Sequence, residues 1–389
     1  MKNSDVKKGF SSYFSDHINV IDKIHSKGFE AYFVGGCVRD ALSDKAPYDF
    51  DVTTNAKPDD IKKIFEKVSD TGVRFGTVSV TENSTVYEIT TYRIEEGYSD
   101  RRTPDKVTYT DKLYEDLKRR DFTVNAMAYD GHSCIIDYFN GMDDLRSRII
   151  RTVGDPDIRF AEDALRILRA IRFAVTLKYK IEERTKASIV KNAGSLSCIS
   201  RERIYGEISR IIKAGENLDI LYANDIAGYV FIYPKLVNRQ ILESEEYICR
   251  LASVFYNYPD ISGVKEELVN FRTDNRTIKA VTDIISNRDM SSFDEYDIRK
   301  LITEIGVINT KYLLTFKNAG LDTYEVITAG RFLRSENDLT INGYDIMDIG
   351  YSSNEIKKIK AFLLEEVLHD PTLNKKDILL KKLKQKRDI

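Results

Sequence analysis

Two short segments near the N-terminus combine residue types that suit chemistry at a phosphate group. Asp49 and Asp51 stand two positions apart in an apolar run, so on a β-strand both carboxylates point to one face, where they can hold divalent metal. Gly35 and Gly36 precede a helix whose free backbone N–H groups suit a phosphate, and Arg39 follows one turn later. Together the two segments predict a nucleotidyl-transfer site.

Metal-assisted nucleotidyl transfer needs carboxylates that place ions against the attacking hydroxyl, the α-phosphate and the leaving pyrophosphate. We expect Asp49 and Asp51 to bind Mg2+ for this purpose, and Glu88, in the middle of a neighbouring strand, to complete the catalytic set. Each feature also has a simpler interpretation. Asp-x-Asp pairs occur in surface turns and calcium loops, Glu88 could only face solvent at a sheet edge, and the two glycines could only form a tight turn.

The elements that must hold these residues fall into two regions. Strand-like runs alternate with helical stretches in the first region, at residues 31–34, 50–54, 77–81 and 86–92. From about residue 143 onward, charged segments with helical periodicity take over, including residues 161–177, 201–213 and 353–368. The patterns predict an α+β head with a mixed sheet and helices, followed by an all-α neck, body and tail. The predicted domains are the catalytic head at residues 1–143, the neck at 144–215, and the body and tail at 216–389.

Composition narrows the class of protein further. The chain has 389 residues, of which 42% are hydrophobic, enough for several packed domains. It has no apolar run near about twenty residues and no hydrophobic secretory signal, so we expect a cytoplasmic protein without membrane association. The four cysteines lack the paired spacing of a zinc site or a disulfide framework. A net charge of -2 argues against a uniformly basic surface, and monomer and homodimer are both compatible with the sequence.

The segment from Gly35 to Asp51 resembles the first signature of class II tRNA nucleotidyltransferases and bacterial poly(A) polymerases, which belong to the DNA polymerase beta superfamily. Four further segments resemble later signatures of this family and occur in the expected order: Arg119 to Ala128, Asp137 to Leu145, Glu162 to Arg166 and, more loosely, Glu202 to Arg210. The resemblance is specific over residues 31–212 and diffuse beyond, where Ile341 to Asp345 is similar to the C-terminal part of CCA-adding enzymes.

A third group of charged residues suits the reading of a nucleobase. Glu162, Asp163, Arg166 and Arg169 fall within an arc of about 120° if residues 161–177 form one helix. A solvated face with ion pairs would give the same pattern. However, cytosine and adenine both present an amino donor beside a ring-nitrogen acceptor, which one carboxylate and one guanidinium can read together. The resemblance also assigns this role to Asp163 and Arg166, and we expect Arg169 to contribute to nucleotide binding.

The segment from Arg119 to Asn125 mixes cations, a carboxylate and an amide. From sequence alone it could be a charged helix start capped by Asp121. The resemblance implies ribose and phosphate contacts, with Arg120, Asp121 and Asn125 as the nucleotide-binding residues that distinguish a ribonucleotide by its 2′-hydroxyl. We therefore expect a site role for this group.

The combined prediction is an enzyme that adds CCA, or its terminal part, to the 3′ end of tRNA from CTP and ATP with Mg2+ as cofactor. The polar loop from Tyr98 to Tyr109 favours competence for A, because a loop at this place helps the resembling enzymes switch from C to A. An A-adding enzyme, a poly(A) polymerase and a non-catalytic RNA-binding protein are the alternatives. No Gly-Arg-Arg-Phe element typical of poly(A) polymerases occurs. The lysines from Lys375 to Lys386 suit contacts with tRNA phosphates, although such clusters usually only solvate a helix.

Overall fold

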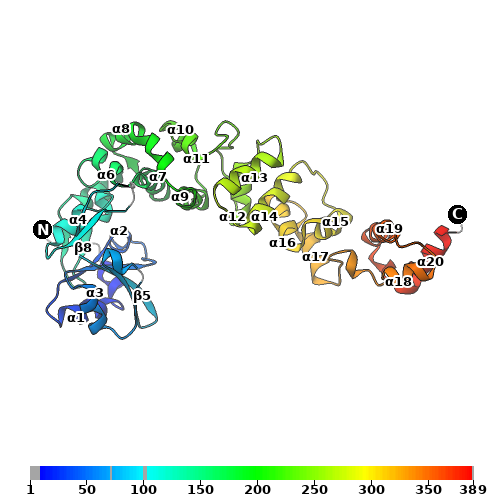
Figure 1. Ribbon diagram of the computed structural model, residues 1–389, viewed down its shortest axis with the longest axis horizontal. Coiled ribbons are helices and arrows are strands. Elements are labelled where there is room, and N and C mark those ends of the chain that lie inside the picture. Colours follow the sequence, from blue (N-terminus) through cyan, green and yellow to red (C-terminus); the bar gives the residue numbers. More distant parts are fainter. Residues whose placement is uncertain (1–8, 71, 100–102, 388–389) are drawn as a thin grey trace. The chain divides into compact units, whose positions relative to one another are not determined.

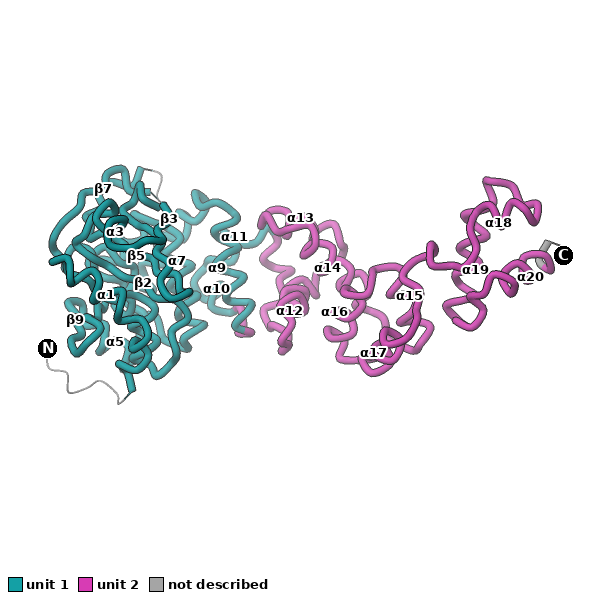
Figure 2. The backbone as a smooth tube through the Cα atoms, turned by 90° about the horizontal axis from the view of Figure 1, so that it is seen from below, with its two compact units in different colours: residues 1–214, 219–232 teal, residues 215–218, 233–389 magenta. Residues whose placement is uncertain are grey.

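The computed structural model describes residues 9–70, 72–99 and 103–387. The chain divides into two compact units, one of residues 1–214 with 219–232 and one of residues 215–218 with 233–389 (Figure 2). All strands of the described residues lie in the first unit, and the second unit is helical (Figure 1). The predicted fold class, an α+β head with a mixed sheet followed by a helical region, is confirmed.

A seven-stranded mixed sheet organises the first unit, with the strand order β3-β4-β5-β2-β1-β8-β9. The central pair β2 and β5 runs parallel, and the other neighbouring pairs are antiparallel. The strands are β1 (Ala31–Val34), β2 (Phe50–Thr54), β3 (Val68–Ser69), β4 (Thr77–Glu82), β5 (Thr85–Thr91), β8 (Met127–Tyr129) and β9 (Ile135–Asp137). Two short pairs lie outside this sheet: β6 (Arg93–Glu96) with β7 (Lys106–Tyr109), and β10 (Ile149–Ile150) with β11 (Lys180–Ile181).

The four strands predicted from alternation are present at or near their predicted bounds. The predicted ranges 31–34 and 50–54 coincide with β1 and β2. The range 77–81 ends one residue before β4 does, and the range 86–92 is shifted by one residue relative to β5. The last four residues of the predicted loop, Lys106 to Tyr109, form β7 of a hairpin, and residues 100–102 lie outside the described residues. Burial alternates along β4 and β5, as expected for strands with one buried face, whereas β1 and β2 are buried over most of both faces.

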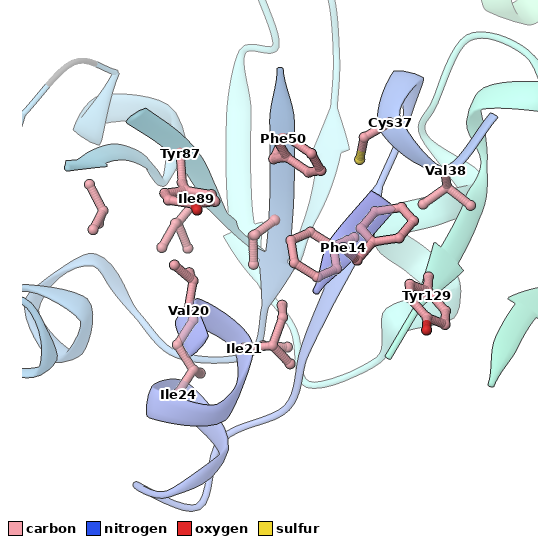
Figure 3. Close-up of a cluster of buried hydrophobic side chains, with 14 of the residues drawn as sticks. Phe14, Val20, Ile21, Ile24, Cys37, Val38, Phe50, Tyr87, Ile89 and Tyr129 are labelled. Carbon is pink, nitrogen blue, oxygen red and sulfur yellow. The ribbon is translucent and has the colours of Figure 1, made fainter. Parts of the chain in front are cut away.

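One face of the sheet packs against N-terminal segments to form the core of the head. Alternate residues of β2 and β5, Phe50 and Val52 with Tyr87 and Ile89, are buried in one cluster with residues of α1 (Ile18–His25) and of the 3-10 helix η1 (Phe10–Phe14). Figure 3 shows side chains of α1 and of Phe14 directed at these strand residues. Because side chains alternate along a strand, this burial leaves Asp51 and Glu88 on the opposite face.

The remaining helices of the first unit surround the sheet and continue beyond it. Those of the head are α2 (Gly36–Leu42), α3 (Pro58–Ile64), η2 (Val73–Phe75), α4 (Leu113–Lys118), η3 (Thr123–Asn125) and α5 (Gly141–Ser147). Those that follow are α6 (Pro156–Glu162), α7 (Leu165–Leu177), α8 (Glu183–Asn192), η4 (Ala193–Cys198), α9 (Arg201–Ala214), α10 (Asp219–Ala223) and α11 (Ala227–Val230). The helix predicted at residues 201–213 corresponds to α9.

The prediction of one continuous helix over residues 161–177 is wrong. Helix α6 ends at Glu162, and Asp163 has extended backbone angles, φ -141° and ψ 104°. Its carboxylate accepts a hydrogen bond from the N–H of Leu165 at 3.0 Å, at the first residue of α7. A side chain that satisfies the N–H groups of a new helix competes with continuation of the old one, so the chain restarts here.

The second unit consists of helices with their own buried clusters. Its elements are α12 (Tyr247–Val254), α13 (Ile261–Asn270), α14 (Asn275–Ser286), α15 (Glu295–Ile305), α16 (Val307–Lys317), α17 (Leu321–Ala329), η5 (Glu336–Asp338), α18 (Gly343–Asp348), α19 (Ile356–His369), η6 (Pro371–Leu373) and α20 (Lys376–Arg387). The predicted helix at residues 353–368 corresponds to α19, shifted to begin at Ile356. Among the described residues, no helix has the length and apolar character that crossing a membrane requires.

Candidate active site

The first element of the site is the turn between strand β1 and helix α2. Gly35 connects β1 to α2 with φ 78° and ψ -134°, a conformation that favours glycine. A Cβ atom built on Gly35 would lie 3.3 Å from Nη1 of Arg120 and 3.3 Å from Oδ2 of Asp51. The turn therefore brings backbone, a guanidinium and a carboxylate together. Gly36 has helical geometry, and its built Cβ would meet only Nη2 of Arg39, at 3.6 Å.

Three acidic residues gather on the open face of the sheet. Asp51 is the direct partner of Glu88 in the parallel pairing of β2 with β5, and Asp49 immediately precedes β2. Burial raises the pKa of Asp51 to about 6; Arg120 opposes this shift, while Asp49 and Glu88 add to it. The arrangement thus concentrates negative charge around one partly buried carboxylate. An all-oxygen donor set with this excess of charge fits Mg2+.

Arg39 is more enclosed than the sequence suggested. Its side chain is 8% exposed, and its guanidinium donates to Oδ1 of Asn125 at 2.6 Å and to the carboxylate of Asp40 at 2.8 Å. It also lies over the ring of Phe173, with Cζ 5.2 Å from the ring centroid. The carboxylate of Asp40 therefore helps to orient the guanidinium of Arg39. Through its hydrogen bond to Asn125, Arg39 fixes the segment from Arg119 to Ala128.

Asp121 joins that segment to helix α7. Its Oδ1 accepts from Asn125 at 3.1 Å, and its Oδ2 accepts from Nε and Nη2 of Arg169 at 2.9 and 2.7 Å. Burial alone would raise the pKa of Asp121, but Arg169 and Asn125 lower it to about 2, so the carboxylate stays ionised. The alternative of a helix start capped by Asp121 is wrong, because the 3-10 helix η3 that follows has Phe122 as its N-cap residue and no side-chain cap.

Arg120 presents a donor toward the site. Its Nη2 lies 3.5 Å from Oδ2 of Asp116, and its Nη1 borders Gly35. Within the part of the chain that the structure describes, the buried Nε of Arg120 has no hydrogen-bond acceptor. A buried guanidinium N–H without an acceptor costs free energy unless a ligand supplies one. Arg120 is therefore suited to a phosphate or ribose oxygen.

Asp163 and Arg166 line one cavity of about 450 Å³, which Glu88, Tyr98 and Arg203 also line. The Oδ2 of Asp163 accepts from Nη2 of Arg203 at 2.9 Å. Arg166 donates to Glu162 at 2.5 Å and to the carbonyl oxygen of Arg119, which also lines the cavity, at 3.1 Å. Carboxylate and guanidinium are thus both fixed at the wall of a pocket of nucleotide dimensions.

The structure brings most of the predicted residues into two connected groups. Asp51, Glu88, Gly35 and Arg120 form one, and the chain of hydrogen bonds from Arg39 through Asn125 and Asp121 to Arg169 forms the other. Arg169 does not line the cavity of Asp163 and Arg166; it holds Asp121 instead. Glu162, Asp163, Arg166 and Arg169 do not share one helix face as predicted, because the helix is interrupted at Asp163.

Asp116, which the sequence did not single out, is fully buried beside the site. Its carboxylate accepts from Thr53 of β2 at 2.9 Å and from two nitrogens of Arg119 at 2.9 and 2.7 Å. Arg119 in turn contacts Glu95 of β6 at 3.3 Å. Asp116 thereby ties strand β2 to the segment from Arg119 to Ala128. The available signal was its i,i+3 and i,i+4 spacing to Arg119 and Arg120.

Comparison with known proteins agrees with this fold and site. Residues 31–151 match the poly A polymerase head domain, and residues 178–228 match the probable RNA and SrmB-binding site of polymerase A. The fold and the site thus define a nucleotidyltransferase. The chain is 36% identical to a CCA-adding enzyme of Lactobacillus helveticus, over 87% of this chain and 91% of that protein. It is 35% identical to one of Ligilactobacillus salivarius, over 96% of both. The chain belongs to the family of CCA-adding enzymes.

A solved structure supports the same assignment over nearly the whole length. The CCA-adding enzyme of Bacillus stearothermophilus, determined in complex with CTP, superposes with a TM-score of 0.83 at 27% identity. The comparison covers 97% of this chain and 98% of that one. The similarity therefore includes the helical region as well as the head.

Proposed function

We propose that this enzyme completes the 3′ CCA end of tRNA, taking its nucleotides from CTP and ATP. The observation that carries the proposal is the cavity that Asp163 and Arg166 line together with Glu88. Glu88 is the direct strand partner of Asp51. Nucleotide transfer without a template requires side chains that recognise the base, and next to them carboxylates that bind the metal. The names of the relatives and of the solved structure point to the same reaction.

The carboxylates of Asp49 and Asp51 would hold Mg2+, with Glu88 beside them. Bound there, the metal supplies charge stabilisation for in-line attack of the tRNA 3′-hydroxyl on the α-phosphorus, with pyrophosphate as the leaving group. We assign Arg120 to the triphosphate, because its guanidinium lies beside the Gly35 turn and its Nε has no acceptor among the described residues. No covalent intermediate with the protein is required.

Base selection follows from hydrogen-bond complementarity. Asp163 accepts from the amino group of cytosine or adenine, and Arg166 donates to the adjacent ring nitrogen. Uracil and guanine present the reverse pattern, which would leave both protein groups without partners. Asp121 and Asn125 are assigned to the ribose, and Arg169 supports them through its two hydrogen bonds to Asp121.

The proposal also assigns a function to each of the three predicted domains. We assign catalysis to the head at residues 1–143, base reading to the neck at 144–215, and tRNA binding to the body and tail at 216–389. Two of the C-terminal lysines form ion pairs, Lys376 with Asp345 at 2.6 Å and Lys382 with Glu366, which reduces the charge available for phosphates. A tRNA substrate implies that the enzyme acts in the cytoplasm.

The test is incorporation of labelled CTP and ATP, separately and together, into tRNA ending at the discriminator base, at C or at CC. Ordered addition of C, C and A that then stops is the expected result. Addition of A only to the CC-ended tRNA would instead identify an A-adding enzyme, and unlimited A would identify a poly(A) polymerase. Absence of magnesium-dependent pyrophosphate release would overturn the enzymatic assignment altogether.

A further inference from the structure

Two histidines and an aspartate converge on the surface of the head, away from the catalytic carboxylates. Asp22 and His25 lie three residues apart on α1, and His132 lies in the turn between β8 and β9. One ligand atom from each of the three residues lies within 4.8 Å of the others. We propose that Asp22, His25 and His132 form a binding site for a divalent transition metal ion of the zinc type.

The two segments that carry these residues are held together without a metal. Oδ1 of Asp130 accepts the backbone N–H groups of His132, Ser133 and Cys134 at 2.8, 2.8 and 2.9 Å, which fixes the turn. A Cβ on Gly131 would lie 3.3 Å from Cγ1 of Ile18, so the turn packs directly on the start of α1. The ligand-bearing backbones are therefore already in place, and a metal would have to order only side chains.

Helix α1 is anchored equally firmly. Its residues Val20, Ile21 and Ile24 are at most 1% exposed and belong to the core beneath the sheet (Figure 3). Asp22 and His25 occupy a common face of the helix because residues three apart are neighbours on its surface. Asp22 and His132 are about half exposed, at 49% and 54%, and Nε2 of His132 lies 3.0 Å from Oδ1 of Asp22. An ion from solvent can reach all three side chains.

Nδ1 is the nitrogen of His25 that is available to a metal, because Nε2 is engaged by the backbone of Ala31 in either tautomer: it accepts from the N–H or donates to the carbonyl. Its Nε2 lies 3.2 Å from both the carbonyl oxygen and the amide nitrogen of Ala31, the first residue of β1. Ligation at Nδ1 places the ring proton on Nε2, which then donates to that carbonyl. Histidine ligands in metal sites typically donate their second N–H to a backbone carbonyl or carboxylate in this way.

The donor set selects the class of metal. Two imidazoles and one carboxylate suit Zn2+, Co2+ or Ni2+, whereas Mg2+ prefers oxygen ligands alone. Three protein ligands leave a fourth position for water. The site lies on the α1 side of the sheet, and Asp51 and Glu88 lie on the other side, so the bound ion would tie α1 to the β8–β9 turn and stabilise the head without entering the reaction.

Calorimetric titration of the full-length protein with Zn2+ tests the proposal, with Mg2+ in large excess to occupy the catalytic carboxylates. We expect one equivalent of Zn2+ to bind, with at least about 100-fold weaker binding in His132→Ala and His25→Ala. His369→Ala is the matched control, since this histidine lies in the second unit and pairs with Glu365 at 3.9 Å; it should bind Zn2+ like the wild type. Asp51→Asn should also retain the equivalent.

Thermal unfolding of the same variants gives an independent readout. Zn2+ should raise the Tm of the wild type and of His369→Ala, but not that of His132→Ala, whose CMP incorporation should be unchanged. If the wild type binds no Zn2+ under excess Mg2+, or if His132→Ala binds it equally well, the proposal is overturned and His132 and Asp22 form only a surface ion pair. Loss of the bound equivalent in Asp51→Asn would likewise overturn it, because the ion would then sit at the catalytic carboxylates.

Discussion

Asp51 and Glu88 are direct partners across the parallel strands β2 and β5, so their side chains share one face of the sheet. Neighbouring like charges and burial both disfavour the ionised form of a carboxylate. Here they raise the pKa of Asp51 to about 6, against the opposing effect of Arg120. A divalent cation bound beside Asp51 would offset this concentration of negative charge.

Asp51→Asn should separate stability from activity. Because the pKa of Asp51 is raised in the folded state, ionisation of this residue destabilises the metal-free fold at neutral pH. The substitution removes that charge, and we expect the metal-free Tm to rise by about 2–4 °C. Incorporation should fall by about 100-fold, because in the proposed function Asp51 is a ligand of the metal. Differential scanning calorimetry and a primer-extension assay on tRNA check the two effects, and a lower Tm with retained turnover would contradict both.

The affinity for Mg2+ should depend on pH in a defined direction. Below a pH of about 6 the proton competes with Mg2+ for Asp51, so the apparent dissociation constant should rise as the pH falls, by up to about tenfold per pH unit. Above this range it should level off. The measurement is the Mg2+ concentration giving half-maximal CMP incorporation across this pH range. An unchanged Mg2+ requirement through pH 6 would show that Asp51 is not a ligand.

The two glycines of the turn offer a matched pair of substitutions. Gly35→Ala puts a side chain at φ 78° and within 3.3 Å of Arg120 and Asp51, so we expect a loss of about 1–3 kcal/mol in stability and of nucleotide affinity. Gly36 has helical geometry, so Gly36→Ala should keep or slightly raise the free energy of unfolding. Urea unfolding and CTP titration of both variants check this. Equal stabilities would show that the positive φ of Gly35 does not constrain the residue type.

Asp116 should be essential for the stability of the head. Burial alone would raise its pKa, but Arg119 and Arg120 lower it, so the stability it contributes is present above about pH 4 and is lost as the pH falls further. Asp116→Ala leaves both guanidinium groups without this partner and should cost about 3–5 kcal/mol. Glu115→Ala is the control, because Glu115 forms only a partly exposed pair with Lys118 at 3.4 Å. Equal Tm values for the two variants would show that Asp116 does not stabilise the head.

Sequence patterns predicted the features that depend on local alternation and motif order. Phe50 and Val52 alternate with Asp51, which was sufficient to place β2 and its two faces. The break at Asp163 could not be predicted, because the hydrophobic pattern continues through it. The restart depends on a hydrogen bond to Leu165 and on a contact with Arg203, forty positions away along the chain.

Partners that are distant in sequence also explain why Asp116 and the role of Arg169 were missed. The buried carboxylate of Asp116 on α4 is bound by Thr53 of strand β2, and Arg169 binds Asp121 instead of lining the cavity of Asp163 and Arg166. Residue type and helical spacing carry no information on such contacts. They define which groups can interact on one element, but not which element packs against it.

Arg166→Ala should weaken the choice among nucleotides more than the chemistry. The guanidinium is fixed by Glu162 and by the carbonyl oxygen of Arg119, so in the proposed function it meets the ring nitrogen with a defined orientation. Losing this donor should reduce the preference for CTP over UTP by about 10- to 100-fold, while the Mg2+ requirement stays the same. Ratios of kcat/KM for the two nucleotides measure the effect. Arg169→Ala is the comparison, because it lies outside the cavity and should lower turnover with both nucleotides alike; unchanged selectivity in Arg166→Ala would refute base reading by this residue.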